Sequence, residues 1–341
     1  MFDDWVRWDG QAIGVDDGAL PGLQRVGFVR SVRSPQFEGM TFHEVLCKSA
    51  LNKVPAASAL PFRFTVNGYR GCSHACRYCF ARPTHEYLDL DSGSDFDTQV
   101  VVKTNVAEVL RRELRRPSWN RETVALGTNT DPYQRAEGRY ALMPGIIEAL
   151  AESGTPFSIL TKGTLLRRDL GLIADASARV PVSVSVSLAI GDDELHRDAE
   201  PGTPSPQARL GLISAIRGAG LECHVMVAPV LPYLTDSVEH LDALLGRIAA
   251  AGANGVTVFG LHLRGSTRGW FMDWLGRSRP DLVGEYQRLY RRGAYLPADY
   301  RDMLRSRARP LIARHGLTGA PRVVGAGSAT AAASPEQPTL F

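Results

Sequence analysis

Short apolar runs alternate with longer amphipathic stretches from about residue 62 to residue 263, and this alternation constrains the fold more than any other feature. Runs such as PFSILTKG and VPVSVSVSL have the length of β-strands, whereas stretches such as VAEVLRRELRR carry apolar residues at helical spacing. Strands that alternate with helices in this way indicate βαβ units around a parallel sheet. About six such units favour an α/β fold built as a partial (β/α)6 TIM-like barrel over a three-layer sandwich.

Changes in composition and periodicity divide the chain into four predicted regions. Residues 1–57 form an N-terminal extension, which ends in a short helix over TFHEVLCKSALNKV. Residues 58–265 form the barrel, and residues 266–318 form a basic, aromatic, helical segment. Residues 319–341 include GAGSATAAASPEQP, and this low-complexity composition is typical of a disordered, flexible tail.

The sequence predicts a cytoplasmic protein with no membrane segment. No apolar run approaches the roughly 18 to 20 residues that a membrane span requires. The N-terminus, MFDDWVRWDGQ, carries acidic residues where a secretory signal would have a basic start and an apolar run. Three of the five cysteines are clustered, which argues against a disulfide framework and for thiolate metal ligands in a reducing compartment.

The clustered cysteines are Cys72, Cys76 and Cys79, and the loop that carries them supplies no fourth cysteine. One interpretation is a tetrahedral zinc site that His74 completes. The other is a [4Fe–4S] cluster, in which three thiolates leave one iron with an open coordination position. The open position suits a catalytic cluster, and the placement of the loop after the first strand of a βα-repeat chain favours this second interpretation.

The spacing C-x3-C-x2-C, with Tyr78 just before the last cysteine, resembles the signature of the radical S-adenosylmethionine (radical SAM) enzymes. Together with VVKTNVAEVLRREL and LGTNTDPYQ, the segment GCSHACRYCFARPTHEYLDL is similar to the spore photoproduct lyase-like branch, also called DNA repair photolyase-like. This resemblance covers about residues 60–265. It implies a [4Fe–4S] cluster whose open iron binds S-adenosylmethionine, cleavage of that cosubstrate to a 5′-deoxyadenosyl radical, and a reductant such as flavodoxin or ferredoxin.

Polar residues at the ends of successive predicted strands are candidate contacts for S-adenosylmethionine. The resemblance places the methionyl amine near GTNTDPYQ, whose candidates are Thr128, Asn129, Thr130 and Asp131. The same residue types also build ordinary strand-to-helix turns. The resemblance places the carboxylate near Lys162, for which the alternative is a solvated surface lysine.

A further group of candidates lies on the next strands and in the cysteine loop. In VSVSVSL the serines alternate with valines, so Ser183, Ser185 and Ser187 share one face and can hydrogen-bond a ribose there. Buried serines satisfied by their neighbours are the alternative. Tyr78 is also assigned to cofactor binding, and Glu200 is a weaker candidate for the same pocket.

One departure from the resembled branch limits the reaction. Spore photoproduct lyases proper return hydrogen to the product radical from a cysteine in the segment that aligns with GTNTDP. Thr128 takes that position here, and its O–H bond is too strong to donate hydrogen readily. The remaining cysteines, Cys47 and Cys223, lie outside this segment. Thymine-dimer reversal by the lyase mechanism is therefore not expected.

The segment from Arg264 to Arg322 combines positive charge with aromatic side chains. It contains 13 arginines and no lysine against five acids, for a net charge of +8. A cationic surface with aromatic platforms is typical of nucleic-acid binding, whereas aromatics at helical spacing are more often core. We therefore expect hydrogen abstraction from a nucleic-acid base in DNA repair. The alternatives are an RNA, small-molecule or peptide substrate for the same chemistry, or a non-catalytic zinc-bearing adaptor.

The last five residues, QPTLF, resemble the Q-x-x-L-F peptide that docks bacterial repair proteins on the sliding clamp. In this interpretation Gln337, Leu340 and Phe341 fill the pockets of the clamp. A short motif at the end of a disordered tail can order on binding, which favours a partner-binding role.

Overall fold

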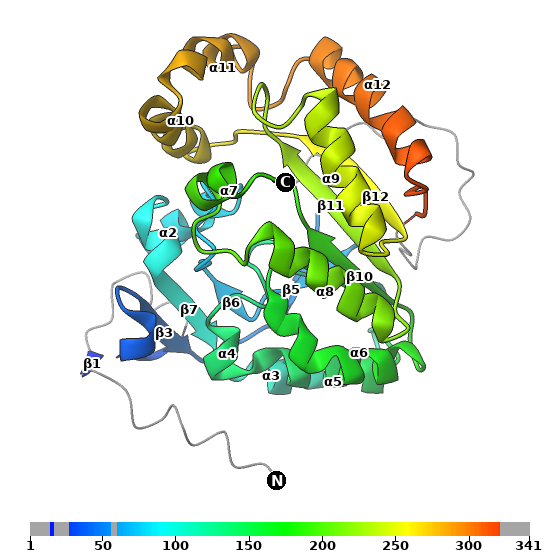
Figure 1. Cartoon of the computed structure of the whole chain (residues 1–341). Helices are drawn as coiled ribbons and strands as arrows, with labels where there is room; N and C mark the ends of the chain where they lie inside the picture. The colour runs from blue at the N-terminus through cyan, green and yellow to red at the C-terminus, as the bar shows by residue number, and fades with distance from the viewer. Residues whose placement is uncertain (1–13, 17–26, 56–59, 321–341) are drawn as a thin grey trace.

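The computed structural model describes residues 14–16, 27–55 and 60–320 (Figure 1). In its larger sheet six strands are parallel, and β4 (Leu51–Lys53) runs antiparallel beside the first of them. The parallel strands are β5 (Phe64–Val66), β8 (Val124–Leu126), β9 (Phe157–Thr161), β10 (Val182–Ser187), β11 (Cys223–Val230) and β12 (Gly255–Gly260). Since β12 and β4 are the two ends of the strand order, the barrel is open, which confirms the predicted partial (β/α)6 fold.

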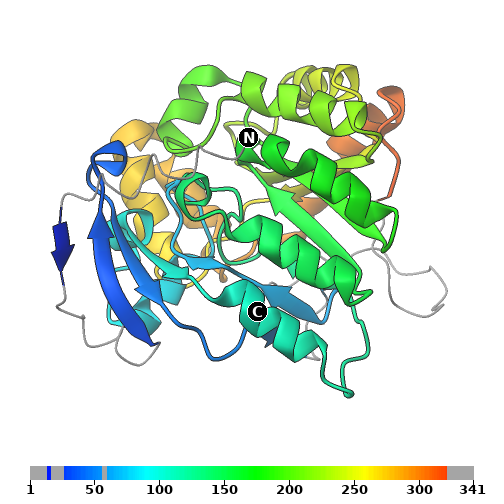
Figure 2. The same cartoon turned by 90° about the horizontal axis from the view of Figure 1, so that it is seen from below.

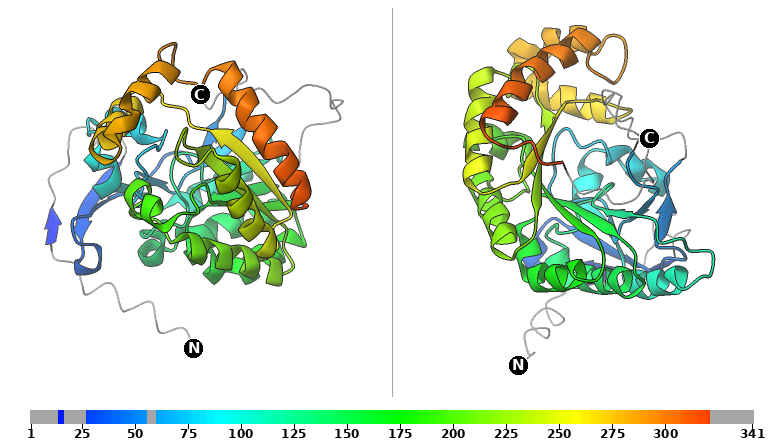
Figure 3. Two further views of the ribbon diagram at one scale, coloured as in Figure 1. Left: turned by 45° about the horizontal axis from the view of Figure 1, so that its top comes forward. Right: turned by 90° about the vertical axis from the view of Figure 1, so that its right-hand side faces the viewer.

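Helices cover the outer face of this curved sheet (Figure 2 and Figure 3). They are α3 (Val106–Leu114), α5 (Leu142–Glu152), α6 (Leu170–Ser177), α8 (Pro206–Gly218) and α9 (Val238–Ala250). Two of them begin at serine caps, since Ser205 and Ser237 accept hydrogen bonds from the first-turn backbone of α8 and α9. Val184 and Val186 of β10 are buried in the core, so the serines of that strand alternate onto the other face, as predicted.

A second sheet packs beside the barrel and is built largely from the N-terminal region. Its strand order is β1 (Gly14–Asp16), β2 (Phe28–Arg33), β3 (Thr41–Val45), β7 (Gln99–Lys103) and β6 (Tyr69–Arg70). The segment VVKT begins within β7, which pairs with β3 in this sheet rather than with the barrel strands.

The predicted helix over TFHEVLCKSALNKV is wrong. Its first residues form β3, and its last residues form β4, which pairs with β5 of the barrel. All five residues of β3 are buried, because strands flank it on both sides and side chains pack on both faces. A strand buried in this way shows no alternation, and its apolar residues can match helical spacing by chance.

The basic C-terminal segment is helical, as the sequence predicts. It contains α10 (Thr267–Ser278), the single turn η5 (Pro280–Leu282), α11 (Val283–Leu289) and α12 (Ala298–Arg314). Most of its aromatic residues are core, because Phe271, Trp274, Tyr286 and Tyr290 pack against Leu231 and Leu261 at the ends of the last two barrel strands. No helix in the described ranges is long and apolar enough to span a membrane. The predicted flexible tail lies almost entirely outside the described residues.

Candidate functional site

The cysteine loop begins where β6 ends, on the side of the barrel where the parallel strands terminate. Gly71 opens the loop with a φ of +85°, and a side chain there would collide with His85 and the Gln99 backbone. The loop is then fastened by backbone contacts, because the Cys72 amide donates to the Phe96 carbonyl at 2.9 Å.

Arg82 is the principal anchor of the cysteine loop. Its guanidinium is fully buried and donates twice to the Cys76 carbonyl, at 3.2 and 2.9 Å, and once to the Gly93 carbonyl at 2.7 Å. Its Nη2 group also donates to both oxygens of the Asp97 carboxylate, at 2.8 and 3.0 Å. Trp270 of α10 stacks on the same guanidinium, with 4.7 Å between Cζ of Arg82 and the ring centroid. One buried cation thus fixes the carbonyl of a cysteine.

The three cysteine side chains converge in a dry environment. Cys72 and Cys76 are buried and Cys79 is partly exposed. Burial raises the pKa of the Cys76 thiol to about 12, and burial together with the other two cysteines raises the pKa of Cys72 well above its usual range. Thiols in this environment ionise only when a metal supplies positive charge, and iron does so. The donor set therefore fits a metal cluster held by three thiolates.

A single zinc ion is a poor fit to the same loop. Among the described residues, no group of three histidine, cysteine or acidic side chains is placed to hold one metal ion. His74, the fourth ligand of the zinc interpretation, lies instead against Asp131, with 3.3 Å between Nδ1 and Oδ2.

Asp131 lies at the end of β8, and protein groups occupy both of its carboxylate oxygens. Oδ1 accepts from the Thr161 hydroxyl at 2.5 Å and from the Tyr133 amide at 2.9 Å. Oδ2 accepts from the Lys162 amide at 2.6 Å and faces His74. Burial favours protonation, but His74 and these hydrogen bonds outweigh it and lower the pKa of Asp131. The carboxylate joins the ends of β8 and β9 to the cysteine loop.

The other residues of GTNTDPYQ make hydrogen bonds to two neighbouring residues, Asn67 and Gly71. Thr128 donates to the Asn67 side chain at 3.3 Å, and the Asn129 amide donates to the same oxygen at 3.2 Å. Thr130 and Gln134 both donate to the Gly71 carbonyl, at 2.7 and 3.0 Å. Thr130 therefore fastens the first residue of the cysteine loop, whereas Thr128 and Asn129 line the strand end beside it.

Lys162, Ser187 and Tyr78 are brought together, although they come from three separate segments. The Lys162 ammonium donates to the Ser187 hydroxyl at 2.9 Å and lies 5.7 Å from the centroid of the Tyr78 ring. Burial alone would lower the pKa of Lys162, but Cys76 and Glu200 raise it. Ser185 lies two residues earlier on the same face of β10 and is half-buried. The predicted strand-end residues thus surround one cation beside the cysteines.

Glu200 and Arg209 form a fully buried ion pair behind this group. Arg209 donates to the Glu200 carboxylate at 2.6 Å and to the Ser187 carbonyl at 3.0 Å. Tyr78 donates its hydroxyl to the same carboxylate. Burial alone would raise the pKa of Glu200, but the Arg209 and Lys162 cations lower it to about 2. The pair therefore positions Tyr78 and Ser187.

We expect Glu200→Gln to destabilise the metal-free protein by roughly 3 kcal/mol at neutral pH. The reason is that the pKa of the Glu200 carboxyl falls from 4.5 to about 2 on folding. A lowered pKa means that the contribution is complete above pH 4.5 and disappears as the pH falls toward 2. Urea unfolding of both proteins at several pH values measures the difference. A gap that stays constant down to pH 2 would contradict the ion-pair explanation.

Several residues of the site were missed by the sequence interpretation, namely Asn67, Arg82, Gln134 and Arg209. Asn67 could have been found, because it is a polar residue directly after the first barrel strand. Gln134 ends the quoted GTNTDPYQ segment. Arg209 lies within an ordinary amphipathic helix, and no local pattern distinguishes it from a solvated arginine.

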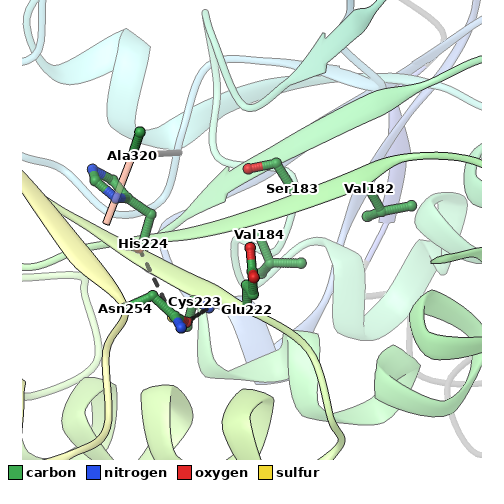
Figure 4. A pocket seen from close by; sticks show the side chains of 8 residues that line it. All are labelled: Val182, Ser183, Val184, Glu222, Cys223, His224, Asn254 and Ala320. Atoms are coloured by element: carbon green, nitrogen blue, oxygen red, sulfur yellow. Dashed lines mark hydrogen bonds between the residues drawn. The ribbon is translucent and has the colours of Figure 1, made fainter. Parts of the chain in front are cut away.

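Cys223 lies away from this site, at the first residue of β11. Figure 4 shows it beside His224 and Asn254, lining a small cavity of about 10 Å³ at the end where the strands begin. Such a volume holds about one water molecule. Because β11 has eight residues, its whole length separates Cys223 from the end where the cysteine loop lies. Cys47 is partly buried against the core and lies in a loop, although the sequence predicts a helix there.

Comparison with known proteins identifies close and distant relatives. The "Uncharacterized protein Rv2578c" of Mycobacterium tuberculosis is 76% identical, covering 98% of this chain and 100% of that protein. The "Uncharacterized protein MJ0683" of Methanocaldococcus jannaschii is 27% identical over 58% of this chain and 70% of its own length. A structure of spore photoproduct lyase complexed with dinucleoside spore photoproduct has a TM-score of 0.61 at 15% identity, over 80% of this chain and 79% of that one. This last similarity supports the fold alone.

The model of the radical SAM superfamily matches residues 66–245. This match covers more than half of the chain and includes all three clustered cysteines, Lys162 and the serines of β10. Enzymes of this family carry a [4Fe–4S] cluster and S-adenosylmethionine, and these are the cofactors of this chain. The zinc-adaptor hypothesis does not agree with this membership. The chain belongs to the radical SAM superfamily.

Proposed function

We propose that this radical SAM enzyme abstracts hydrogen from a nucleic-acid base and takes part in DNA repair in the cytoplasm. The observation that carries the proposal is the direct packing of the basic C-terminal segment on the cysteine loop, where Thr267 donates to the Cys79 carbonyl at 3.1 Å. Polyanion bound by this segment would therefore lie beside the radical source. Spore photoproduct lyase, which shares the fold, has been solved in complex with dinucleoside spore photoproduct, and we propose a substrate of the same chemical class here.

In this proposal Cys72, Cys76 and Cys79 hold the [4Fe–4S] cluster, which supplies the electron that cleaves S-adenosylmethionine. Lys162 binds the methionyl carboxylate, and Ser185 and Ser187 face the ribose. Thr128 and Asn129 lie where the methionyl amine is expected, and Tyr78 packs against Lys162. Asp131 positions Lys162 and the loop rather than contacting the cosubstrate, because its oxygens already have protein partners.

The substrate reaction differs from that of a lyase which returns hydrogen from a cysteine. Thr128 donates its hydroxyl to Asn67, and Cys223 lies at the far end of its strand. Within the described residues, no thiol besides the three cluster ligands lies in this loop. The product radical would therefore take its hydrogen atom either from another group or from 5′-deoxyadenosine, and the second route would turn 5′-deoxyadenosine back into its radical.

Reduction of the cluster requires a donor, for which we propose flavodoxin or ferredoxin. We also propose that Gln337, Leu340 and Phe341 bind the sliding clamp. These residues lie outside the described part of the chain. A pull-down with purified clamp tests the motif, using the full-length protein and a variant lacking QPTLF, and equal capture of both would contradict it.

Lys162→Gln is expected to weaken the binding of S-adenosylmethionine by about ten- to a hundredfold, because a charged hydrogen bond in a buried site is worth about 1.5 to 3 kcal/mol. Isothermal titration of the cluster-loaded protein measures the affinity. Lys53→Gln, an exposed site on β4, is the matched control and should bind like the wild type. Equal affinities of both variants for S-adenosylmethionine would show that Lys162 does not bind the cosubstrate.

The proposed substrate class is tested by the yield of 5′-deoxyadenosine after anaerobic reduction. We expect single-stranded or damaged DNA to raise the yield above that of the protein alone. RNA of the same sequence and an unrelated peptide serve as parallel arms. A yield that DNA leaves unchanged, while RNA or the peptide raises it, would contradict a DNA substrate without affecting membership of the family.

A further inference from the structure

The arginines of the basic C-terminal segment fall into two groups in the structure. One group is neutralised by acidic partners, in the pairs Arg279–Asp281, Arg288–Glu285, Arg305–Asp302, Arg307–Asp236 and Arg314–Asp242. The other group makes no ion pair or side-chain hydrogen bond with any described residue and consists of Arg264, Arg268, Arg277, Arg291, Arg292, Arg301 and Arg309. The net charge of the segment is therefore concentrated in the second group.

Four members of the second group occupy positions that lie close together where the chain leaves β12. The Leu263 amide donates to the Ala294 carbonyl at 2.8 Å, which places the backbone beside Arg264 against that beside Arg292. Tyr290, which immediately precedes Arg291, donates to the Leu261 carbonyl at 2.7 Å.

Arg268 reaches the same place from α10. Burial raises the pKa of the Tyr290 phenol, and the nearby charge of Arg268 lowers it in part. We call Arg264, Arg268, Arg291 and Arg292 the arginine rim. Arg291 and Arg292 are exposed, whereas Arg264 and Arg268 are half-buried.

The arginine rim lies next to the cysteine loop. The His262 ring is held between Phe80, which follows Cys79, and Tyr295, with ring centroids 5.8 Å apart in both contacts. Gly265 lies against Pro83 of the same loop. His262 Nε2 and the Tyr295 hydroxyl are buried without a hydrogen-bond partner in the described structure. Buried polar atoms normally have a partner in the protein or in water, and a bound molecule is one group that can supply it.

The charge at this place is strongly positive. Glu86 contacts this stretch, where its carboxylate accepts from the Ser266 hydroxyl at 2.5 Å. The four guanidinium groups of the rim outnumber this carboxylate. Guanidinium forks match phosphate oxygens bidentately, and aromatic faces beside them accept unstacked bases.

We propose that the arginine rim binds the phosphodiester backbone of the substrate strand on the side of the barrel next to Cys79. This inference rests on the proposed function and names the surface that delivers its substrate. The backbone would cross the rim while a base turned out of the strand reaches past His262 and Tyr295 toward the cluster.

The salt dependence of DNA binding tests the rim. Each phosphate contact contributes about 0.7 to the slope of log K against log salt for a single strand. The quadruple variant Arg264→Gln/Arg268→Gln/Arg291→Gln/Arg292→Gln should therefore lower the slope by roughly two to three. Fluorescence anisotropy of a labelled single-stranded DNA, measured with cluster-loaded protein and S-adenosylmethionine at several salt concentrations, gives the slope.

The matched control removes four arginines that already have acidic partners, in Arg279→Gln/Arg288→Gln/Arg305→Gln/Arg314→Gln. It deletes the same formal charge and should leave the slope close to that of the wild type. Iron content and thermal unfolding confirm that each variant is folded. The double variant of the exposed pair, Arg291→Gln/Arg292→Gln, should lower the slope by about one to 1.5 and guards against misfolding of the quadruple variant.

The outcomes separate the rim from the proposed function. Wild-type binding that weakens steeply with salt, but is unchanged in the quadruple or double rim variant, overturns the rim and leaves the nucleic-acid substrate in place. Equal losses in the rim and control variants also overturn the rim, because they indicate a diffuse charge effect. A wild-type protein that binds neither DNA nor RNA overturns the proposed function together with the rim.

Discussion

Replacing Cys72, Cys76 or Cys79 singly with alanine is expected to abolish both the iron–sulfur cluster and the cleavage of S-adenosylmethionine. With two thiolates the cluster loses one of its three protein anchors, and the buried loop offers no other soft ligand, because His74 is held by Asp131. Iron and sulfide content after anaerobic reconstitution, followed by the yield of 5′-deoxyadenosine, measures the two losses.

The matched control for these variants is Cys47→Ala. Cys47 is partly buried in the loop that follows β3, and its backbone is held by Asn105 independently of the side chain. It should load the cluster and cleave the cosubstrate like the wild type. A cysteine-loop variant that still assembled a full cluster and formed 5′-deoxyadenosine would show that its thiol is not a ligand.

Arg82→Met is expected to have the second largest effect, because it leaves the Asp97 carboxylate and the Cys76 carbonyl buried without their cation. Breaking a buried pair from one side typically costs about 3 to 5 kcal/mol. The variant should also load less iron, since the carbonyl of a ligand residue is released. Urea unfolding and iron content measure these two effects. Arg82→Lys restores charge but not the planar fork, so we expect only partial recovery.

Arg77→Met is the control for Arg82. Arg77 lies in the same loop and near the same Trp270 ring, at 5.8 Å from its centroid, but it makes no ion pair with a described residue, and its charge acts on Asp97 only at longer range. We expect a destabilisation well below that of Arg82→Met. Similar losses from both substitutions would mean that any arginine in this loop stabilises it through stacking on Trp270, and the anchoring role of Arg82 would be wrong.

Much of the fold could be predicted because each barrel strand is a local pattern. VPVSVSVSL shows its buried and polar faces directly, and the helices between strands show their caps and apolar spacing. The order of strands then follows from the chain, since parallel βα units stack in sequence. The same stacking predicts that Lys162 and Ser187 lie at one edge of the sheet. In the structure the Lys162 ammonium donates to the Ser187 hydroxyl at 2.9 Å.

The parts that could not be predicted depend on contacts between distant residues. The pairing of β3 with β7 joins segments far apart in the chain, and burial on both faces removes the alternation that marks a strand. Glu200 and Arg209 stabilise each other only because α8 returns to β10. In the sequence, either residue alone would be interpreted as a solvated surface charge. The pairing of acids with arginines in the C-terminal helices is likewise a tertiary property.

We propose that the three thiolates leave one iron of the cluster open for S-adenosylmethionine. Electron paramagnetic resonance of the reduced, reconstituted protein tests it most directly, with and without the cosubstrate. We predict that S-adenosylmethionine changes the signal of the reduced cluster and that the Cys76→Ala protein shows no such signal. A wild-type signal that the cosubstrate leaves unchanged, because a fourth protein ligand caps the iron, would contradict the account.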